Sequence, residues 1–313
     1  MTRERGDGVG DDGDADEAAR EAFALLGHDL RLEIVLALLE RWRAAATEPT
    51  GYADLMRAVG LEDSGKFNYH LQKLRGVYVR KTDEGYVPTA AATALYRAVL
   101  GSRPTTDDDV TLDGPDASCP ACGTDLAATY EHGFLEVTCP DCGSERPHVS
   151  FPLPRNALAG RTETEVYGAV ADRVHGFADL VRRGQCPYCA GTVSVSIDPE
   201  AVDRPAPEAV DTDAHAVGFD DALRFDCDRC SLVLVPSFTG ALAREPRVVA
   251  TLRSIGVDTE DSPPWVLPLP GRELRSRDPL RVALTWTTDG GTATVVVDDT
   301  VAVVSTETAT APE

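Results

Sequence analysis

The sequence predicts an α+β chain built from several domains, and three patterns carry that prediction. The first is helical periodicity through the N-terminal third, which also contains a short basic segment. The second is a set of 8 cysteines arranged as four C-x-x-C pairs in the middle of the chain. The third is a pair of alternating apolar segments near the C-terminus. With 313 residues, the chain is long enough for two or three domains.

The N-terminal third begins with the spacing of three helices. Residues 17–26 (EAAREAFALL) predict a short amphipathic helix that ends at Gly27. Asp29 is the expected cap of a second helix, in which leucine and valine repeat at helical spacing. Residues 52–59 (YADLMRAV) predict a third helix that stops at Gly60.

A locally basic segment, residues 64–81, follows in a chain whose formal net charge is −22. It carries five basic side chains and no acidic one, and it holds every lysine of the chain. Asp63 or Ser64 is the expected cap of a fourth helix at its start. The apolar stripe of that helix is Phe67, Leu71 and Leu74. A cationic segment in so acidic a chain predicts an anionic partner.

A β-hairpin is expected after this helix. Residues 77–79 and 86–87 are β-prone, and they flank the polar turn 83–85, which ends in glycine. Thr89 is the expected cap of a final helix over residues 90–100. This order of elements predicts a winged helix-turn-helix, whose fourth helix enters the major groove of DNA and whose hairpin is the wing.

The expected DNA contacts lie off the apolar stripe of the fourth helix and on the first strand of the hairpin. Asparagine and glutamine pair bidentately with adenine, and lysine contacts guanine or phosphate. Basic residues on a wing contact phosphate or the minor groove. The predicted contact residues are Lys66, Asn68, Tyr69, Gln72, Lys73, Arg80 and Lys81. The alternative is a solvated basic helix beside an unrelated hairpin.

Three stretches, LGHDLRLEIVLALL, YADLMRAVGLEDSGKFNYHLQKL and VRKTDEGYVPTAAA, resemble the arsenical-resistance-repressor (ArsR) type of winged helix. The similarity is greatest to the version found in salt-adapted archaea, where a DSGxFNYHL-like helix and an RKTDEGY-like wing recur. The resemblance covers about residues 20–100 and implies a DNA-binding transcriptional regulator, usually a homodimer. Metal-sensing members carry a cysteine motif on the third helix. Residues 52–57 hold no thiol, so metal sensing is not expected there.

Composition points to a protein adapted to high salt. There are 52 aspartates and glutamates, and almost all basic residues are arginine. This balance resembles proteins from cells with molar internal salt, and the alternative is an acidic mesophile protein. At about 1 M salt the Debye length is roughly 3 Å, so phosphate contacts lose most of their contribution to affinity. Specific DNA binding must then depend on base-edge hydrogen bonds, on apolar contacts such as Tyr69, and on a dimer.

No apolar run approaches 18 residues and no signal peptide is evident, which predicts a soluble cytoplasmic protein without a membrane partner.

The four C-x-x-C pairs predict two structural zinc sites. Proline and glycine in CPACGTD and TCPDCGS favour tight turns whose backbone N–H groups point at thiolate sulfur. Four thiolates suit tetrahedral Zn²⁺ and leave no coordination position open for catalysis. The predicted ligands are Cys119, Cys122, Cys139 and Cys142 in the first zinc ribbon and Cys186, Cys189, Cys227 and Cys230 in the second.

Alternatives remain for the cysteines at this point. Disulfides do not suit an intracellular chain, and a redox dithiol normally lies in a thioredoxin-like unit, which is not evident here. The pairs can ligate consecutively, or the first and third pairs can share one metal. Nearby histidines are expected to be surface or core residues, because each site already has four sulfurs. These histidines are His132, His148, His175 and His215.

The rest of the chain predicts a connecting helix and a C-terminal β segment. Thr162 to Glu165 offers a capping box for a helix that ends near Arg183. Trp265 and Trp286 are expected in a core or an interface. The predicted parts are a disordered acidic tail (1–16), the winged helix-turn-helix (17–102), a linker (103–116), zinc ribbon 1 (117–150), the connecting helix (151–184), zinc ribbon 2 with an acidic loop over residues 198–213 (185–245), a C-terminal helix and β segment (246–305) and a tail (306–313).

The sequence contains no GxSxG, P-loop, HExxH or GxGxxG motif, which argues against an enzyme. The favoured hypothesis is a sequence-specific transcriptional regulator that binds double-stranded DNA and uses its zinc ribbons as a structural, interaction or sensing module. One alternative is an adaptor for the transcription machinery, whose architecture resembles archaeal general transcription factor E. Another is a zinc-thiolate redox sensor.

Overall fold

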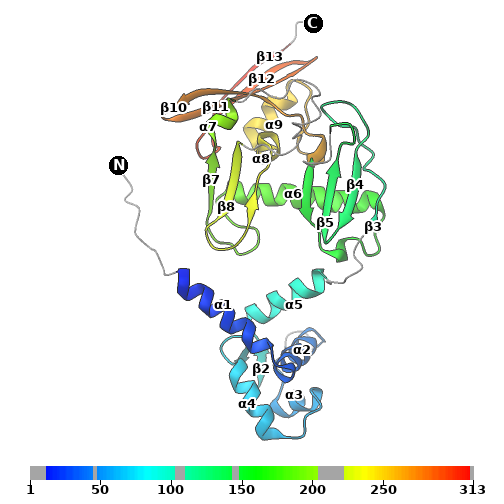
Figure 1. Cartoon of the computed structure of the whole chain (residues 1–313), viewed down its shortest axis with the longest axis vertical. Coiled ribbons are helices and arrows are strands. Elements are labelled where there is room, and N and C mark those ends of the chain that lie inside the picture. Colours follow the sequence, from blue (N-terminus) through cyan, green and yellow to red (C-terminus); the bar gives the residue numbers. More distant parts are fainter. Residues whose placement is uncertain (1–11, 45–47, 103–109, 143–147, 204–221, 311–313) are drawn as a thin grey trace. The chain divides into compact units, whose positions relative to one another are not determined.

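The computed structural model describes residues 12–44, 48–102, 110–142, 148–203 and 222–310. The chain divides into two compact units, Met1–Arg103 and Pro104–Glu313, whose helices and strands are drawn in Figure 1. Each unit has its own hydrophobic core. Both α-helices and small antiparallel sheets are present, as predicted for an α+β chain. None of the helices in these ranges is long and apolar enough to cross a membrane.

In its described residues, the first unit consists of four helices, a two-stranded hairpin and a closing helix. In order these are α1 (Asp12–Leu26), α2 (Asp29–Ala44), α3 (Tyr52–Ala58), α4 (Ser64–Leu74), β1 (Val79–Lys81), β2 (Tyr86–Pro88) and α5 (Ala90–Ser102). The core forms where α2 and α4 meet, because Ile34, Leu38, Phe67 and Leu71 are all fully buried. Helical apolar periodicity therefore positions α4 with one face inward and the opposite face in solvent.

Side-chain caps fix where α4 and α5 begin. The Asp63 carboxylate accepts a hydrogen bond from the Lys66 backbone N–H at 2.9 Å, so Asp63, one of the two candidates, is the cap of α4. The Thr89 hydroxyl accepts from the Ala92 N–H at 3.3 Å, as expected for α5. Asp29, by contrast, does not cap α2. The ring nitrogen Nδ1 of His28 accepts from the Leu30 N–H at 3.2 Å, and Asp29 is the first helical residue.

The hairpin starts two residues later than predicted. The Tyr78 N–H still bonds to the Leu74 carbonyl at 3.0 Å, which continues the turn after α4 and leaves Val79 as the first strand residue. Thr50 pairs with β2 on the side of the hairpin away from β1. Its N–H donates to the Tyr86 carbonyl and its carbonyl accepts from the Tyr86 N–H, both at 2.9 Å. A Cβ on Gly85 would lie 2.5 Å from the Thr50 carbonyl oxygen, so only glycine fits at the end of this turn.

The part of the second unit that the structure describes contains three antiparallel sheets. The first sheet is β3 (Val110–Thr111), β4 (Ala127–Glu131), β5 (Phe134–Thr138) and β6 (Val149–Pro152). The second is β7 (Val193–Ile197), β8 (Leu223–Cys227) and β9 (Val233–Leu234). The third is β10 (Gly271–Arg277), β11 (Leu280–Thr288), β12 (Gly291–Asp298) and β13 (Val303–Thr310). The helical elements are η1 (Arg155–Ala157), α6 (Glu163–Arg182), α7 (Pro199–Val202), α8 (Phe238–Leu242), α9 (Pro246–Arg253) and η2 (Pro264–Val266).

The long helix α6 joins the first two sheets. It begins with the predicted capping box, in which the Thr162 N–H donates to Glu165 Oε2 at 2.8 Å and the Thr162 hydroxyl accepts from the Glu165 N–H. Val166 and Val170 are buried against the first sheet, whereas Val181 is buried with the second. Figure 1 shows α6 running across both sheets. The predicted connecting helix therefore packs on both small sheets.

The third sheet and the second sheet share one hydrophobic core. Trp286 is buried on β11, and its indole N–H donates to the Thr239 hydroxyl at 3.1 Å and to the Pro268 carbonyl at 3.2 Å. Trp265 is buried against Tyr167, with the ring centroids 5.9 Å apart. Both tryptophans are core residues, in agreement with the prediction.

Several predicted boundaries in the chain are wrong. α1 begins at Asp12, inside the predicted tail 1–16. β3 lies in the predicted linker 103–116, where it pairs with β4. β6 crosses the predicted boundary at residue 150. Part of the predicted acidic loop 198–213 is α7, which buries Ala201 and Val202, and its residues from 204 onward lie outside the described part.

The prediction from the sequence omitted one strand of the third sheet and shortened another, for the same reason. β10 was not predicted at all, and β13 runs to Thr310, through the predicted tail 306–313. Both lie at the edges of the sheet, and their side chains are exposed or half-buried. An edge strand with polar side chains lacks the apolar alternation on which sequence prediction depends.

Candidate metal centres and nucleic-acid interface

Two turns at one end of the first sheet bring four cysteines together. Cys119 and Cys122 lie in the turn before β4, and Cys139 and Cys142 lie in the turn after β5. The sulfur atoms of Cys119 and Cys142 are 3.8 Å apart, and those of Cys122 and Cys139 are 3.4 Å apart. All four sulfurs lie within 4.8 Å of one another, and this group is named centre 1.

The second sheet repeats the arrangement. Cys186 and Cys189 lie in the turn before β7, and Cys227 and Cys230 lie at the end of β8 and just beyond it. The sulfur atoms of Cys186 and Cys230 are 3.6 Å apart, and those of Cys189 and Cys227 are 3.5 Å apart. These four sulfurs also lie within 4.8 Å of one another and form centre 2.

Both groups fit a tetrahedral zinc ion. A Zn–S distance of about 2.3 Å places the sulfurs of a regular tetrahedron about 3.8 Å apart, close to the observed separations. A disulfide needs about 2.05 Å, and all eight cysteines are free thiols. The pairs ligate consecutively, because each centre draws on two neighbouring pairs. The two four-cysteine groups therefore fit two structural zinc sites, and the interleaved alternative is wrong.

Backbone N–H groups point at the sulfurs, as the proline- and glycine-containing turns predict. Five such hydrogen bonds have a length of 3.4 Å, from Ala121 to Cys119, Cys142 to Cys139, Tyr188 to Cys186, Gly191 to Cys189 and Arg229 to Cys227. Hydrogen bonds from Thr124 lower the pKa of the Cys122 thiol to about 6. The backbone hydrogen bond from Arg229 lowers the pKa of the Cys227 thiol to about 7. One thiol in each centre is thus shifted toward the thiolate that binds a metal.

The two centres differ in the burial of their cysteines and in the backbone conformation of the residue that follows the first cysteine pair. Cys119 and Cys139 are both buried in centre 1, whereas centre 2 buries Cys186 alone. After the first pair of centre 1, Gly123 adopts φ +79°. At the equivalent position of centre 2, Ala190 adopts φ +58°, in the left-handed region that disfavours side chains with a Cβ.

Three of the four nearby histidines lie in the described part of the chain. His132 is exposed, and His175 is a buried core residue whose Nε2 lies 3.1 Å from the Ser262 carbonyl. His148 is also buried, but its Nε2 lies 3.6 Å from Cys119 Sγ, a contact that the sequence did not indicate. Burial lowers the pKa of His148 and of His175, which favours neutral imidazoles. His215 lies outside the described residues.

In the first unit, α4 exposes its polar face. All seven predicted DNA contacts are exposed, namely Lys66, Asn68, Tyr69, Gln72, Lys73, Arg80 and Lys81. The opposite face of α4 is buried in the core through Phe67, His70, Leu71 and Leu74. The helix therefore presents side chains that can hydrogen-bond to base edges on a rigid, anchored element.

Contacts among these side chains order the exposed face. The Gln72 amide donates to Asn68 Oδ1 at 3.4 Å, and the Arg75 guanidinium donates to Gln72 Oε1 at 2.6 Å. The Lys73 ammonium lies 5.9 Å from the centroid of the Tyr69 ring. These bonds join amide and cationic groups along one stripe of α4.

A hollow between the end of α4 and the hairpin is lined by cationic side chains. Its lining residues are Gln72, Arg75, Gly76, Val79, Arg80, Lys81 and Thr89. Arg75 was not among the predicted contacts, although it lies beside Gln72 at the end of the basic segment. Asp83 and Glu84 are exposed at the hairpin tip, so the cationic part of the hairpin is β1.

Comparison with known proteins separates the chain into the same two parts. Residues 19–99, within the first unit, match the family model described as domain of unknown function (DUF7347). No curated protein and no solved structure matches the chain. A second family model spans residues 116–303, more than half of the chain, and includes both four-cysteine centres. The chain therefore belongs to the family described as domain of unknown function (DUF7351).

Proposed function

We propose that the protein is a transcriptional regulator that binds specific DNA sequences through a winged helix-turn-helix formed by the first unit. The observation that carries the proposal is the exposed face of α4. There the Gln72 amide hydrogen-bonds to Asn68 and to Arg75, and the side chains of Lys66 and Lys73 are also exposed. This combination suits base-edge readout in the major groove. The hairpin β1–β2 serves as the wing, and Arg80 and Lys81 contact the DNA backbone.

The charge of the chain decides which contacts give affinity. Apart from its basic segment, a chain of net charge −22 repels DNA, and at molar salt phosphate contacts contribute little. We propose that the chain is adapted to high salt, where the amides of α4 and the Tyr69 ring supply most of the specificity. The five basic side chains of residues 64–81 act mainly by removing local repulsion.

A homodimer would double the interface with DNA. Large apolar side chains of the first unit are exposed on α1, α2 and α5, namely Phe23, Leu32, Leu36, Val99 and Leu100. Phe23 is 66% exposed and Val99 is 52% exposed, so covering them with a second copy of the chain would remove apolar area from water. We propose that this surface forms the contact between two copies of the chain, so that the DNA site is palindromic.

The two zinc-ribbon-like modules are proposed to bind protein and not DNA. Asp125 and Asp141 are exposed near centre 1, and Glu131 is exposed at the other end of β4, so this acidic module repels phosphate. Deletion of residues 117–150 should therefore leave the DNA affinity of a dimer unchanged. A loss of affinity in a dimer that stays intact would contradict this assignment.

Selection of genomic fragments by the zinc-loaded protein in molar potassium chloride tests the proposed function. The wild type should enrich short palindromic sites, and the Lys66→Ala, Asn68→Ala double variant should not. Arg41→Ala is the matched control, because Arg41 is an exposed basic residue on α2 and not on α4. Fragment recovery without sequence preference by the wild type would reject the proposal.

Two other functions are favoured by particular observations. The acidic surface near centre 1 also suits an adaptor that binds the transcription machinery, which would be supported by capture of RNA polymerase without a selective footprint. The greater exposure of centre 2 suits a zinc-thiolate redox sensor. For that function, Cys230→Ser should abolish the response of the protein to oxidant while DNA binding persists. A variant that merely unfolds would assign the site a structural role.

A further inference from the structure

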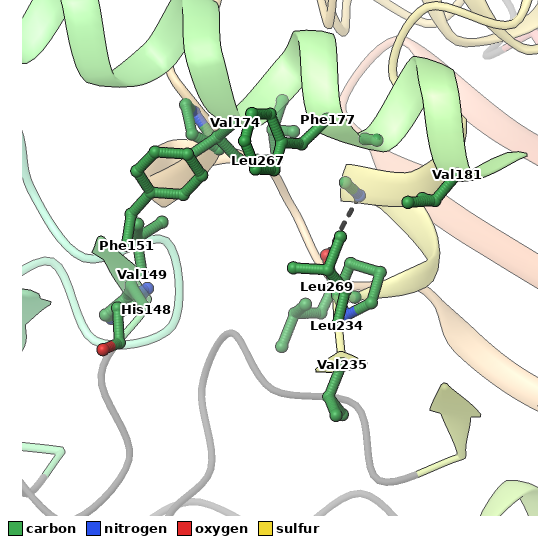
Figure 2. A pocket seen from close by; sticks show the side chains of 16 residues that line it. His148, Val149, Phe151, Val174, Phe177, Val181, Leu234, Val235, Leu267 and Leu269 are labelled. Carbon is green, nitrogen blue, oxygen red and sulfur yellow. Dashed lines mark hydrogen bonds between the residues drawn. The ribbon is translucent and has the colours of Figure 1, made fainter. Parts of the chain in front are cut away.

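A cavity lies where α6 meets the two zinc-ribbon-like modules. Its roof is the apolar face of α6, with Val174, Phe177 and Val181 pointing into it (Figure 2). Phe151 of β6 lines one side, and Leu234 and Leu269 line the opposite side (Figure 2). The lining therefore comes from both modules, from α6 and from the segment before β10, all within the second unit.

The cavity is large enough for a ring-sized group and is mainly apolar. Its volume is about 110 Å³. An apolar cavity of about 150 Å³ in another protein stays dry and binds benzene, so a volume of this order accommodates a single small apolar group. Leu269 remains 44% exposed at the cavity, which leaves room for the rest of a ligand to reach solvent.

Polar side chains in the lining already have partners. The Ser150 hydroxyl donates to Glu136 Oε1 at 2.9 Å, and the Ser237 hydroxyl accepts from the Gly240 N–H at 3.0 Å. His148 Nε2 contacts Cys119 Sγ at 3.6 Å. A strongly polar ligand would have to compete for these groups, so the cavity favours an apolar ligand.

A cationic side chain lies beside the aromatic part of the lining. The Arg173 guanidinium is 5.8 Å from the centroid of the Phe151 ring and 5.7 Å from that of Phe177. Arg173 precedes Phe177 by one helical turn of α6, so the two side chains lie on neighbouring parts of one face. Arg173 is exposed, and it forms no ion pair within the described ranges of the chain. In a chain of net charge −22, an arginine in this position complements an anionic group at the cavity.

We propose that this cavity binds a small molecule that combines one apolar group, about the size of an aromatic ring, with one acidic group. The apolar group lies under α6 between Phe151 and Leu269, and the acidic group pairs with Arg173. The proposal goes beyond DNA binding, and neither its site nor its test involves DNA. Failure to bind such a molecule would leave the proposed function of the first unit unaffected.

Fluorine NMR titration of the zinc-loaded full-length protein tests the site with defined probes. The probes are 4-fluorobenzoate and its uncharged analogue 4-fluorobenzamide. Both should bind to the wild type, and the acid should bind about threefold more tightly, as expected for an exposed ion pair. Absence of binding by both probes would overturn the proposal.

Two pairs of variants locate the probe. Ala178→Leu places a larger side chain in the cavity and should abolish binding of both probes, whereas Ala250→Leu adds the same group at an exposed position of α9 and should not. Arg173→Gln should remove the preference for the acid, whereas Arg183→Gln, at an exposed position just after α6, should keep it. Unchanged binding by a folded Ala178→Leu protein would overturn the assignment of the cavity.

A second variant of a lining residue tests the site independently if the Ala178→Leu protein does not fold. Leu269→Asp changes a partly exposed side chain and introduces a negative charge at the cavity. It should weaken binding of the acid at least tenfold and binding of the amide less. Equal affinities of wild type and Leu269→Asp for 4-fluorobenzoate would contradict the proposed site.

Discussion

Removal of zinc should unfold the modules of the second unit and leave the first unit folded. Each unit has its own core, and both four-cysteine centres belong to the second. Structural zinc contributes about 10–16 kcal/mol in zinc-finger peptides, which is as large as the roughly 5–15 kcal/mol total stability of a typical domain. Chelation of zinc under reducing conditions therefore removes as much stabilising free energy as a whole domain has, so the small sheets should unfold.

The helices give the expected size of the spectroscopic change. Helices α1 to α5 contain 15, 16, 7, 11 and 13 residues, which makes 62 helical residues in the described ranges of the first unit. Helices α6 to α9 contain 20, 4, 5 and 8 residues, which makes 37 among the residues of the second unit that the structure describes. Circular dichroism at 222 nm should therefore lose at most about two fifths of its helical signal on chelation.

Tryptophan fluorescence provides an independent readout of the same change. Trp265 and Trp286 are 3% and 2% exposed in the second unit, so their emission should shift to longer wavelength when zinc is removed. Added zinc should reverse both changes. Loss of nearly all helical signal would show that the first unit depends on zinc. No change in either signal after both metal ions are removed would refute a structural role for the two centres.

Three further predictions concern single residues. Ala190→Gly should raise the free energy of unfolding by about 0.5–1 kcal/mol in thermal denaturation, because Ala190 adopts φ +58°; a lower melting temperature would contradict this. Thr162→Ala should lower that free energy by about 1 kcal/mol, because it removes the cap of α6. Hydrogen bonds from Thr162 lower the pKa of Glu165, so this stabilisation is present at neutral pH and is lost as the pH falls through the lowered pKa. The difference in stability between wild type and Thr162→Ala should therefore shrink on acidification, and a constant difference would argue against the capping box. Arg75→Ala should weaken DNA binding and reduce the slope of log affinity against log salt by about 1, and an unchanged slope would exclude a phosphate contact.

Local patterns in the sequence were sufficient to predict the elements that carry the candidate sites. The apolar stripe of Phe67, Leu71 and Leu74 predicted which face of α4 is buried, and C-x-x-C spacing predicted all eight ligands of the two centres. The capping box at Thr162 was predicted because both of its members lie within four residues of each other. Such features depend on neighbours in the chain, which a single sequence displays directly.

Features that depend on tertiary contacts could not be predicted. His148 approaches Cys119 because β6 packs beside the turn of centre 1, and no spacing motif records that contact. The cavity under α6 is assembled from segments as distant in the chain as Phe151 and Leu269. β10 escaped prediction because an edge strand with exposed charged side chains resembles a loop in composition.

The ratio of specific to non-specific DNA affinity tests the central claim most directly. It is measured by fluorescence anisotropy in molar potassium chloride, with a selected genomic fragment and a scrambled fragment of the same length and composition. The wild type should prefer the selected fragment by at least about 10³-fold, and the Lys66→Ala, Asn68→Ala variant should lose most of that preference. Equal affinity of the wild type for both fragments would contradict the account of α4 as a helix that reads DNA sequence.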